Sequence, residues 1–479
     1  MSDTFVMEAE RSEAARRGFN LLAIDPIRRL IHWGGFAYVF QAATLLCFVG
    51  LMVFGLALSA PNGVDAKLYA KSNLVNLLIW GLWWPAMVWT AVLVGRVWCA
   101  VCPLELVANF SERLGVRLGV RQFNLAKILR AGWLILFLYI VLQMLVVGAQ
   151  LHRVPRYTAL FMFSLLLLAA IAGLLFKDRA FCRGFCPVGL LLSVYGRGGM
   201  LGVRAASQDA CARCEGKDCV MQHNRRRLDA RSCPSLLNPP KLNGNQDCLV
   251  CGQCIKSCRP DNMQLLLRTP FSRLNAREPF ASWPTVLFIM AVSGFVTSEV
   301  VSGWARAEAA FLWIPEHFSE WLALPDLHGF ITGLWFLGLY PLALWAILGG
   351  LTIAFGGARR IGVAWRRLAL PLAVVVSTAH MAKGLEKAMT WGAFLPAAML
   401  HPDGVSTSLA ISSKALAAPA ALAPHAAYAT VGVVLIILGL VFGLREGKLA
   451  DAASWPKLRV PLAIVALVYA VCVAGWAFR

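Results

Sequence analysis

Eight of the 14 cysteines in this chain lie between Cys211 and Cys258. From Cys248 onward they follow the spacing Cys-x2-Cys-x2-Cys-x3-Cys, which ends at Cys258. Three thiolates this close together can bind three irons of one cubane cluster, while the fourth cysteine reaches a neighbouring cluster. The spacing therefore predicts iron–sulfur clusters, which carry single electrons.

The first half of the same stretch is an imperfect copy of this pattern. It contains Cys211-x2-Cys214-x4-Cys219 and, after a longer insertion, Cys233-Pro. Because the fourth cysteine of each motif crosses to the other cluster in such pairs, we predict two [4Fe-4S] clusters. The predicted ligands are Cys211, Cys214, Cys219 and Cys258 for the first cluster, and Cys233, Cys248, Cys251 and Cys254 for the second.

Structural zinc and disulfides are the alternatives for these eight residues. Zinc closes its shell with four ligands and gives no reason for a third cysteine two residues after a Cys-x2-Cys pair. Disulfides are less expected because the block is predicted below to face a reducing compartment. One departure from the cluster pattern is that Arg259 separates Cys258 from the proline that usually follows directly.

Four further cysteines form two pairs, each followed by proline. They read Cys99-Ala-Val-Cys102-Pro and Cys182-Arg-Gly-Phe-Cys186-Pro, and each pair follows an apolar run. Together they predict a third metal site, or a redox-active dithiol whose thiolates nearby arginines stabilise. The simpler alternative is that each Cys-Pro only ends a helix. The arginines closest in sequence are Arg96, Arg179 and Arg183.

The composition is that of a polytopic membrane protein. Of 479 residues, 59% are apolar and only 15% are charged. The net charge of +20 matters through its distribution across the membrane, so nucleic acid is not an expected partner. We predict a mainly α fold with about nine spans and a small ferredoxin-like insert that carries the two clusters. The predicted spans are 33–58, 73–95, 131–149, 157–176, 284–304, 328–355, 368–390, 427–444 and 460–478.

The positive charges predict the orientation. If the N-terminus is cytoplasmic, most of the 45 Lys and Arg fall on or beside cytoplasmic segments, as the positive-inside rule requires. We therefore expect an inner-membrane protein whose iron–sulfur insert faces the cytoplasm. The predicted domains are an N-terminal membrane unit at 1–176, the two-cluster insert at 177–283 and a C-terminal membrane unit at 284–479. An insert this small needs its metal to fold.

The combination of two Cys-x2-3-Cys-Pro motifs and a following pair of ferredoxin-type sites resembles a family of membrane iron–sulfur proteins. This family includes NapH of periplasmic nitrate reduction and the accessory proteins NosR and CcoG, and the resemblance covers roughly residues 30–265. It implies a membrane protein that passes electrons from quinol or another donor towards periplasmic or assembly partners. The chain departs from the family in its shorter first pair, in lacking an apparent flavin domain and in five additional C-terminal spans.

Ionisable residues within the C-terminal spans predict a further site, because charges in a bilayer are costly. His328 opens the sixth span, and His380 lies within the seventh, close to Lys383 and Glu386. Haem b ligated by His328 and His380 is one interpretation. The others are a buried hydrogen-bonded histidine and a polar cluster that lines a quinone or proton path, to which Glu299 could contribute.

These observations predict a membrane electron-transfer protein that relays electrons through two [4Fe-4S] clusters, from or to the quinone pool. Its expected partners are membrane lipid, quinone or quinol, and a periplasmic or membrane redox protein. If it is an enzyme, it is a component of a quinol-dehydrogenase-type oxidoreductase. The alternatives are a copper-reducing assembly factor for a terminal oxidase or reductase and, in another class, an iron–sulfur redox sensor.

Overall fold

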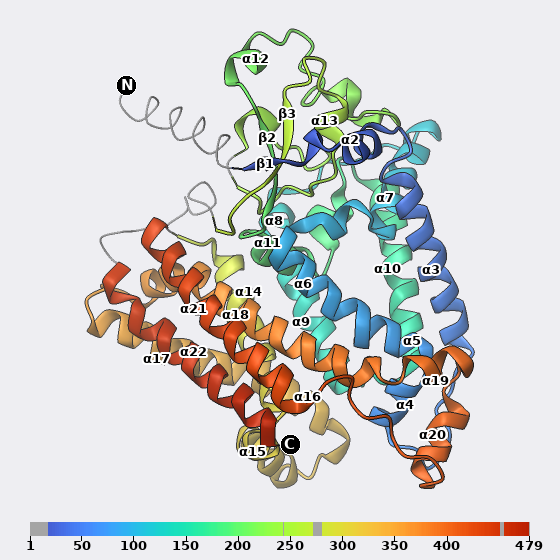
Figure 1. Cartoon of the computed structure of the whole chain (residues 1–479), viewed down its shortest axis with the longest axis vertical. Coiled ribbons are helices and arrows are strands. Elements are labelled where there is room, and N and C mark those ends of the chain that lie inside the picture. The colour runs from blue at the N-terminus through green and yellow to red at the C-terminus, as the bar shows by residue number, and fades with distance from the viewer. Residues whose placement is uncertain (1–17, 243, 272–279, 451–454, 479) are drawn as a thin grey trace. The chain divides into compact units, whose positions relative to one another are not determined.

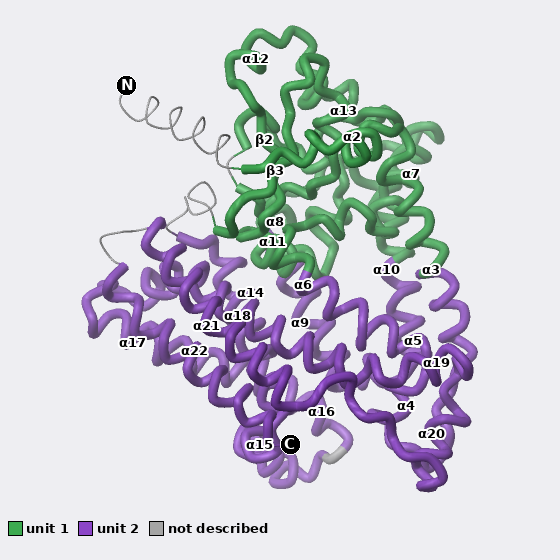
Figure 2. Tube along the Cα trace, in the orientation of Figure 1, with its two compact units in different colours: residues 1–47, 90–131, 166–277 green, residues 48–89, 132–165, 278–479 purple. Residues whose placement is uncertain are grey.

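The computed structural model describes residues 18–242, 244–271, 280–450 and 455–478, and its elements are labelled in Figure 1. The chain forms two compact units, coloured separately in Figure 2. Unit 1 comprises 1–47, 90–131 and 166–277, and unit 2 comprises 48–89, 132–165 and 278–479. Each unit is therefore assembled from segments distant in sequence. The predicted division at residues 176 and 283 stays a prediction.

The described part of the chain contains eight helical segments long and apolar enough to span a bilayer. A ninth apolar helix, α9, is shorter. Every predicted span is thus helical, and the mainly α, polytopic fold is confirmed. The long segments are α3 (Tyr38–Leu56), α5-η2-α6 (Leu74–Val94), α10 (Pro155–Leu175), α14 (Trp283–Val301), α16-η9-α17 (His328–Ala354), α18 (Ile361–Gly392), α21 (His425–Ala450) and η10-α22-η11 (Trp455–Phe478), and α9 is Trp133–Gly148.

The shorter elements of unit 1 position its cysteines. They are η1 (Leu21–Ala23), α2 (Asp25–His32), η3 (Arg96–Ala100), α7 (Pro103–Arg117), α8 (Lys127–Arg130), η4 (Phe181–Phe185), α11 (Gly189–Gly196), α12 (Gln208–Ala212), η5 (Gln222–Arg226), η6 (Pro239–Lys241) and α13 (Gln253–Lys256). Unit 2 adds α4 (Ala66–Ser72), α15 (Ala305–Trp321), η8 (Pro325–Leu327), α19 (Leu395–Leu400) and α20 (Val405–Ser412).

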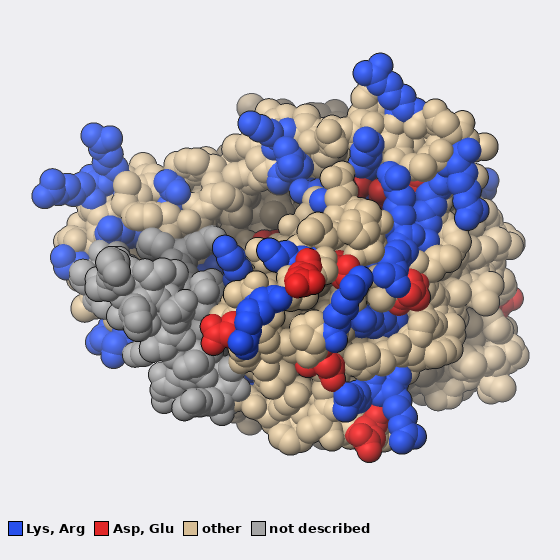
Figure 3. All heavy atoms as spheres, turned by 90° about the horizontal axis from the view of Figure 1, so that it is seen from above, with Lys and Arg blue, Asp and Glu red and all other residues tan. Residues whose placement is uncertain are grey.

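Lys and Arg are the more numerous charged residues of this chain. On the face drawn in Figure 3, Lys and Arg of the described residues are more numerous than Asp and Glu. The whole chain has 45 Lys and Arg against 25 Asp and Glu.

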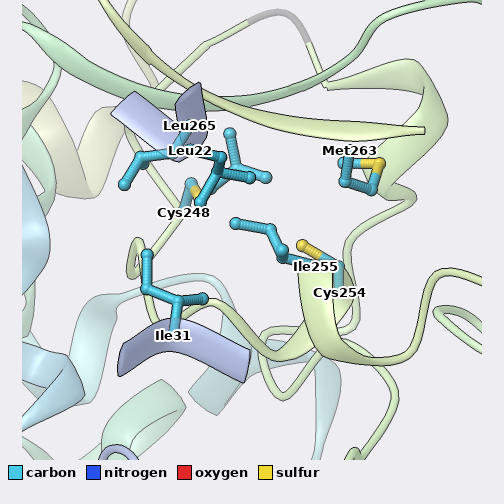
Figure 4. Packing of buried hydrophobic residues seen from close by; sticks show 8 residues of the cluster. Leu22, Ile31, Cys248, Cys254, Ile255, Met263 and Leu265 are labelled. Atoms are coloured by element: carbon cyan, nitrogen blue, oxygen red, sulfur yellow. The ribbon is translucent and has the colours of Figure 1, made fainter. Parts of the chain in front are cut away.

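A small antiparallel sheet and an apolar core hold the cysteine-rich loops of unit 1. The sheet has the order β1-β3-β2, where β1 is Phe19–Asn20, β2 is Leu201–Ala205 and β3 is Met263–Leu267. Val203 of β2 pairs with Leu265 of β3, and both side chains are buried. Figure 4 shows Leu265 in a cluster with Leu22, Ile31 and the sulfur-bearing side chains of Cys248 and Cys254. Two predicted cluster ligands are therefore part of the hydrophobic core.

In unit 2, α18 is the central helix and packs against α21, α14 and α17. Small residues allow the close approach of α21, as is common between membrane helices. A Cβ atom on Gly439 would overlap the side chain of Thr378, and one on Gly443 would lie 2.8 Å from the carbonyl oxygen of Pro371. The contact between α18 and α21 therefore depends on glycine at these positions.

Candidate iron–sulfur sites

Asn262 joins the two halves of the cysteine-rich stretch. Its backbone N–H donates to Sγ of Cys258 at 3.2 Å, and its side-chain amide lies 3.1 Å from Sγ of Cys211. The same amide donates to the carbonyl oxygen of Ser207 at 2.6 Å, immediately before α12, the helix that carries Cys211. Cys258, the last cysteine of the second motif, therefore lies beside the first cysteine of the first motif.

Cys219 belongs to the same group. Burial, and after it the charge of neighbouring cysteines, raises the pKa of Cys219 to about 11. These neighbours are Cys258, Cys211 and Cys214. The structure thus brings together the four residues predicted to bind the first cluster.

The other four cysteines form a second group. Burial, and after it the neighbouring thiols of Cys251 and Cys248, raises the pKa of Cys233 to about 12. Cys254 interacts with all three of these thiols and also with Cys219, so the two groups are neighbours. These interactions place each cysteine near others of its predicted set, and the assignment of the eight residues to two clusters stays a prediction.

Local backbone geometry fixes the second group. Gly252, directly after Cys251, has a φ of 71° and begins α13; a Cβ atom there would lie 2.9 Å from Cγ2 of Ile31. Glycine is therefore required for both the left-handed turn and the close approach. The backbone N–H of Cys233 donates to the carbonyl oxygen of Cys219 at 2.8 Å, which links the second group to the first.

The two Cys-Pro pairs converge into a third group. Cys99 lies in η3, and Cys102 caps the start of α7, where Pro103 is well placed because the first turn needs no backbone N–H. Cys182 lies in η4 and Cys186 ends it. Burial raises the pKa of Cys102, and the thiols of the other three cysteines raise it further. We call these four residues the third cysteine group.

A buried carboxylate, Glu105, lies three residues after Cys102. One of its oxygens is 2.7 Å from Nη2 of Arg231 and 3.2 Å from Nε of Arg179. Nε2 of Gln41 donates to the other oxygen at 2.7 Å. Burial alone would raise the pKa of Glu105, but the charges of Arg231 and Arg179 outweigh it and lower the pKa to about 2. Glu105 is therefore an anion held between two cations.

This carboxylate connects segments from all over unit 1. Arg179 lies three residues before Cys182, and Arg231 lies two before Cys233. Asp178 and Arg179 both have a positive φ, of 62° and 55°, which is uncommon for residues with a side chain. Such strain persists where surrounding contacts hold it, as the ion pair with Glu105 does here.

The donor set fits thiolate-ligated clusters. Several buried donors near the cysteines have no hydrogen-bond partner in the described part of the chain: Arg96 Nε, Arg179 Nη2, Arg231 Nε and Ser232 Oγ. Iron–sulfur clusters are anionic, and hydrogen bonds to their sulfurs tune them, so they would accept these donors. Among the described residues, no three His, Cys, Asp or Glu side chains form a site for a single metal ion. The argument that these residues fit iron–sulfur clusters therefore depends on the twelve thiols and on the cations around them.

Sequence reasoning missed Glu105, Arg231 and Asn262. A sequence signal existed for Glu105, because it is an acidic residue in the first turn of a helix that begins in Cys-Pro. Arg231 and Asn262 lie in loops, and their roles depend on contacts with distant segments.

The two predicted haem ligands have different surroundings in unit 2. His328 begins α16, and its Nδ1 is 3.1 Å from Oγ of Ser319. His380 is buried in α18, with its ring 6.3 Å from that of Trp84 and 5.7 Å from that of Phe295. Haem ligation by the two histidines stays a prediction.

A family model described as a 4Fe-4S binding domain matches residues 76–121 and 158–205. The matched segments contain the third cysteine group, Cys99, Cys102, Cys182 and Cys186. The eight cysteines between 211 and 258 lie outside the match. The comparison therefore connects 4Fe-4S binding with the segments that carry the two Cys-Pro pairs.

Similar curated proteins include the ferredoxin-type protein NapH of Haemophilus influenzae, 31% identical over 185 residues, which are 35% of this chain and 61% of that relative. NapH of Escherichia coli is 27% identical over 199 residues, 36% of this chain and 62% of the relative. The methylamine utilization ferredoxin-type protein MauN of Paracoccus denitrificans is 28% identical over 156 residues, which cover 30% of this chain and 52% of that relative.

The chain thus spans less than two thirds of each of these relatives, and no solved structure matches it. The matched region nevertheless combines apolar helices with the cysteine pairs of a 4Fe-4S domain. Over this region the chain is similar to the NapH-like ferredoxin-type 4Fe-4S membrane proteins.

Proposed function

We propose that this protein transfers electrons between a donor or acceptor in the membrane and a partner protein, through iron–sulfur clusters held by unit 1. The observation that carries the proposal is the gathering of twelve cysteines into three groups of four. Two [4Fe-4S] clusters are assigned to the groups between residues 211 and 258. The ferredoxin-type relatives support electron transfer rather than hydrolysis or transport.

The third cysteine group is assigned a third cluster. A redox-active dithiol needs two cysteines, whereas four converge here, within segments that match a 4Fe-4S binding domain. The charge of Arg179 acts on Cys182 and Cys99 of this group and also on Cys251 of the second. Because the second group is also a neighbour of the first, the proposed route runs through the three groups in order.

The proposed electron donor or acceptor on the membrane side is the quinone pool. Oxidation of one quinol releases two electrons and two protons, so the clusters accept the electrons one at a time and the protons pass to water or basic side chains. The other end of the route is a redox partner protein. We propose the cytoplasmic side for the clusters, which is supported by the excess of Lys and Arg over Asp and Glu on the face drawn in Figure 3. Residues 1–17, predicted to be cytoplasmic, lie outside the described residues.

Anaerobic purification followed by iron and sulfide analysis, electron paramagnetic resonance and quinol addition tests this proposal. Three clusters of four irons give about twelve irons per chain, and quinol should bleach the cluster absorbance. The double variant Cys182→Ser/Cys186→Ser should lose about a third of the iron, whereas Cys472→Ser, a lone cysteine on α22, should lose none. Zinc in place of iron would refute the proposal. Clusters that quinol does not reduce, together with reduction of Cu(II), would favour the copper-reducing assembly factor.

A further inference from the structure

Unit 2 contains a large cavity that no iron–sulfur site uses. It has a volume of about 730 Å³ and lies among α4, the end of α9, the end of α14, α16 and α18. A narrow extension of about 30 Å³ continues to His380. His152, Glu299, Lys383 and Lys387 line both parts. We call the two parts together the His152 cavity.

Charged groups on the membrane-spanning helices line this cavity. Nζ of Lys383 is 3.0 Å from Oε2 of Glu386 and donates to Oγ of Ser302 at 3.0 Å. Nζ of Lys387 is 3.9 Å from Oε2 of Glu299 on α14. Ionisable residues in membrane helices are costly and are retained mainly where they act. Simple packing of α18 against α14 would not need them.

Two buried polar atoms in the wall of the cavity have no hydrogen-bond partner in the described part of the chain. They are Oε1 of Gln143 on α9, beside the narrow extension, and Oγ1 of Thr332 on α16, beside the wide part. Both side chains are more than nine-tenths buried. An unpaired buried polar group costs free energy, so each is suited to a ligand that supplies the missing partner.

The charges along the wall are nearly balanced. The basic side chains are Lys67, Lys71, Arg153, Lys383 and Lys387, and the acidic ones are Glu299, Glu308, Asp326 and Glu386. His152 adds no charge, because Nε of Arg153 donates to its Nε2 at 3.2 Å and burial lowers its pKa to about 3. A balanced wall favours a neutral polar head group over an anionic phosphate.

Flat aromatic side chains surround the narrow extension. The rings of Trp80 and Trp84 lie 6.1 Å apart, and Trp84 and Phe295 flank His380. Aromatic side chains combine large apolar faces with good packing against other rings. The wall therefore suits a planar ring with polar substituents.

An apolar groove adjoins the cavity. It is lined by Leu145, Val154, Tyr157, Leu160 and Phe161 on α9, the following turn and α10, and its wall shares Gly148 and Gln150 with the cavity. Tyr157 and Leu160 are largely exposed on a helix that spans the membrane. A polar pocket beside a lipid-facing groove suits an amphiphile with a compact head and an apolar tail.

We propose that the His152 cavity and this groove bind a lipid-soluble quinone, with its ring in the cavity and its tail in the groove. The proposal rests on the proposed function and deepens it, because it names the part of unit 2 where the quinone binds. Glu299, Gln143 and His380 are the groups that contact or face the ring oxygens. The Glu299 carboxylate, the Gln143 amide oxygen and an imidazole nitrogen of His380 can each accept a hydrogen bond from a hydroxyl of the ring in its reduced, quinol form.

Direct binding tests this site. The full chain, in discs of phosphatidylcholine and without oxygen, is titrated calorimetrically with the reduced, hydroquinone form of a benzoquinone that carries an alkyl tail and with the same compound without the tail. Glu299→Gln and His380→Phe should weaken binding of both probes about tenfold, because an amide oxygen accepts a hydrogen bond more weakly than a carboxylate and phenylalanine accepts none. Leu160→Ser, on the lipid-facing surface, should weaken binding of the tailed probe only.

Glu446→Gln is the control, because Glu446 is a buried carboxyl on α21 that does not line the cavity. It should bind both probes as the unmodified chain does. Absence of quinone binding by the unmodified chain, or unchanged affinity in the Glu299, His380 and Leu160 variants, would overturn the proposal. A phospholipid that co-purifies and blocks quinone binding would overturn it as well.

The binding and reduction experiments together distinguish a failure of this quinone site from a failure of the proposed function. If quinone binds here but quinol does not reduce the clusters, the proposed electron donor is wrong and the site stands. If quinol reduces the clusters while the variants bind quinone normally, the donor stands and this site is wrong.

Discussion

At the scale of single residues, Glu105 is a buried carboxylate that joins two cations near the cysteine groups. Its carboxylate is shared by Arg231 and Arg179, which lie near the second and third groups. Breaking a buried ion pair by removing one partner costs roughly 3–5 kcal/mol, because the other charge stays buried without compensation. The role of Glu105 is therefore to balance charge as well as to join segments.

Replacing Glu105 by Gln should raise the reduction potentials of the second and third clusters. Loss of the negative charge leaves Arg179 and Arg231 in excess, and nearby positive charge favours the more negative, reduced cluster. The expected increase is on the order of 50 mV. Redox titration followed by electron paramagnetic resonance measures it.

The matched control is Glu112→Gln on the same helix, because Oε2 of Glu112 only accepts from the backbone N–H of Arg179 at 3.4 Å. It should shift the potentials little. Equal potentials in the Glu105 variant and the unmodified chain would show that Glu105 has no electrostatic effect on the clusters.

At the scale of elements, the packing of α21 on α18 depends on small residues. Gly439→Ala should destabilise unit 2 by about 1–3 kcal/mol, because the added methyl group overlaps Thr378 and the helices must separate. Thermal unfolding in detergent measures the loss. Adding Thr378→Ala should restore part of it, as expected for residues in direct contact.

Gly50→Ala on α3 is the control for the added methyl group. A Cβ atom at Gly50 would meet nothing within 4 Å, and alanine favours helix more than glycine does. This variant should be at least as stable as the unmodified chain. If both alanine variants behave alike, the close contact of α21 with α18 contributes nothing to stability.

The elements themselves could be predicted from the sequence because uncharged apolar runs mark membrane helices. The seventh span was predicted at 368–390, whereas α18 runs from Ile361 to Gly392. The extension carries Arg366, whose Nε donates to the carbonyl oxygen of Ala281. Charges that find partners in the folded protein can continue a helix, and no local pattern reveals those partners.

The cysteine groups could be predicted from spacing, whereas their surroundings could not. Cys258 was assigned to the group of Cys211 because crossed ligation is a property of paired motifs. Asn262 contacts the sulfurs of Cys258 and Cys211, but no rule of sequence spacing predicts a residue at that position. The role of a loop residue of this kind becomes visible only when tertiary contacts are known.

At the scale of the whole molecule, the two units are stabilised by different means. Unit 1 is loop-rich around its cysteines, with a small sheet and core, whereas unit 2 consists of packed apolar helices. Metal binding is coupled to folding where a core is small. The stability of unit 1 should therefore depend on its iron far more than that of unit 2.

Removing iron with a chelator should expose unit 1 selectively to proteolysis. Without cluster ligation, the loops between Cys211 and Cys258 lose their cross-links, and a protease should cut there first. Mass spectrometry of the fragments identifies the cut sites, and the protein with its iron intact serves as the control. Cuts that appear equally in α14 and α18 of unit 2, or a resistant cysteine-rich stretch, would contradict this expectation.

The contact of Glu105 with Arg179 and Arg231 also bears on biogenesis. A ribosome synthesises the carboxylate long before it reaches either cation, so during translation the emerging chain holds an acidic residue without its later partners. Only when residue 231 has left the ribosome can the three side chains meet. We therefore expect iron delivery to the third cysteine group to follow translation of the loop that carries Arg231, after the first four apolar helices have entered the bilayer.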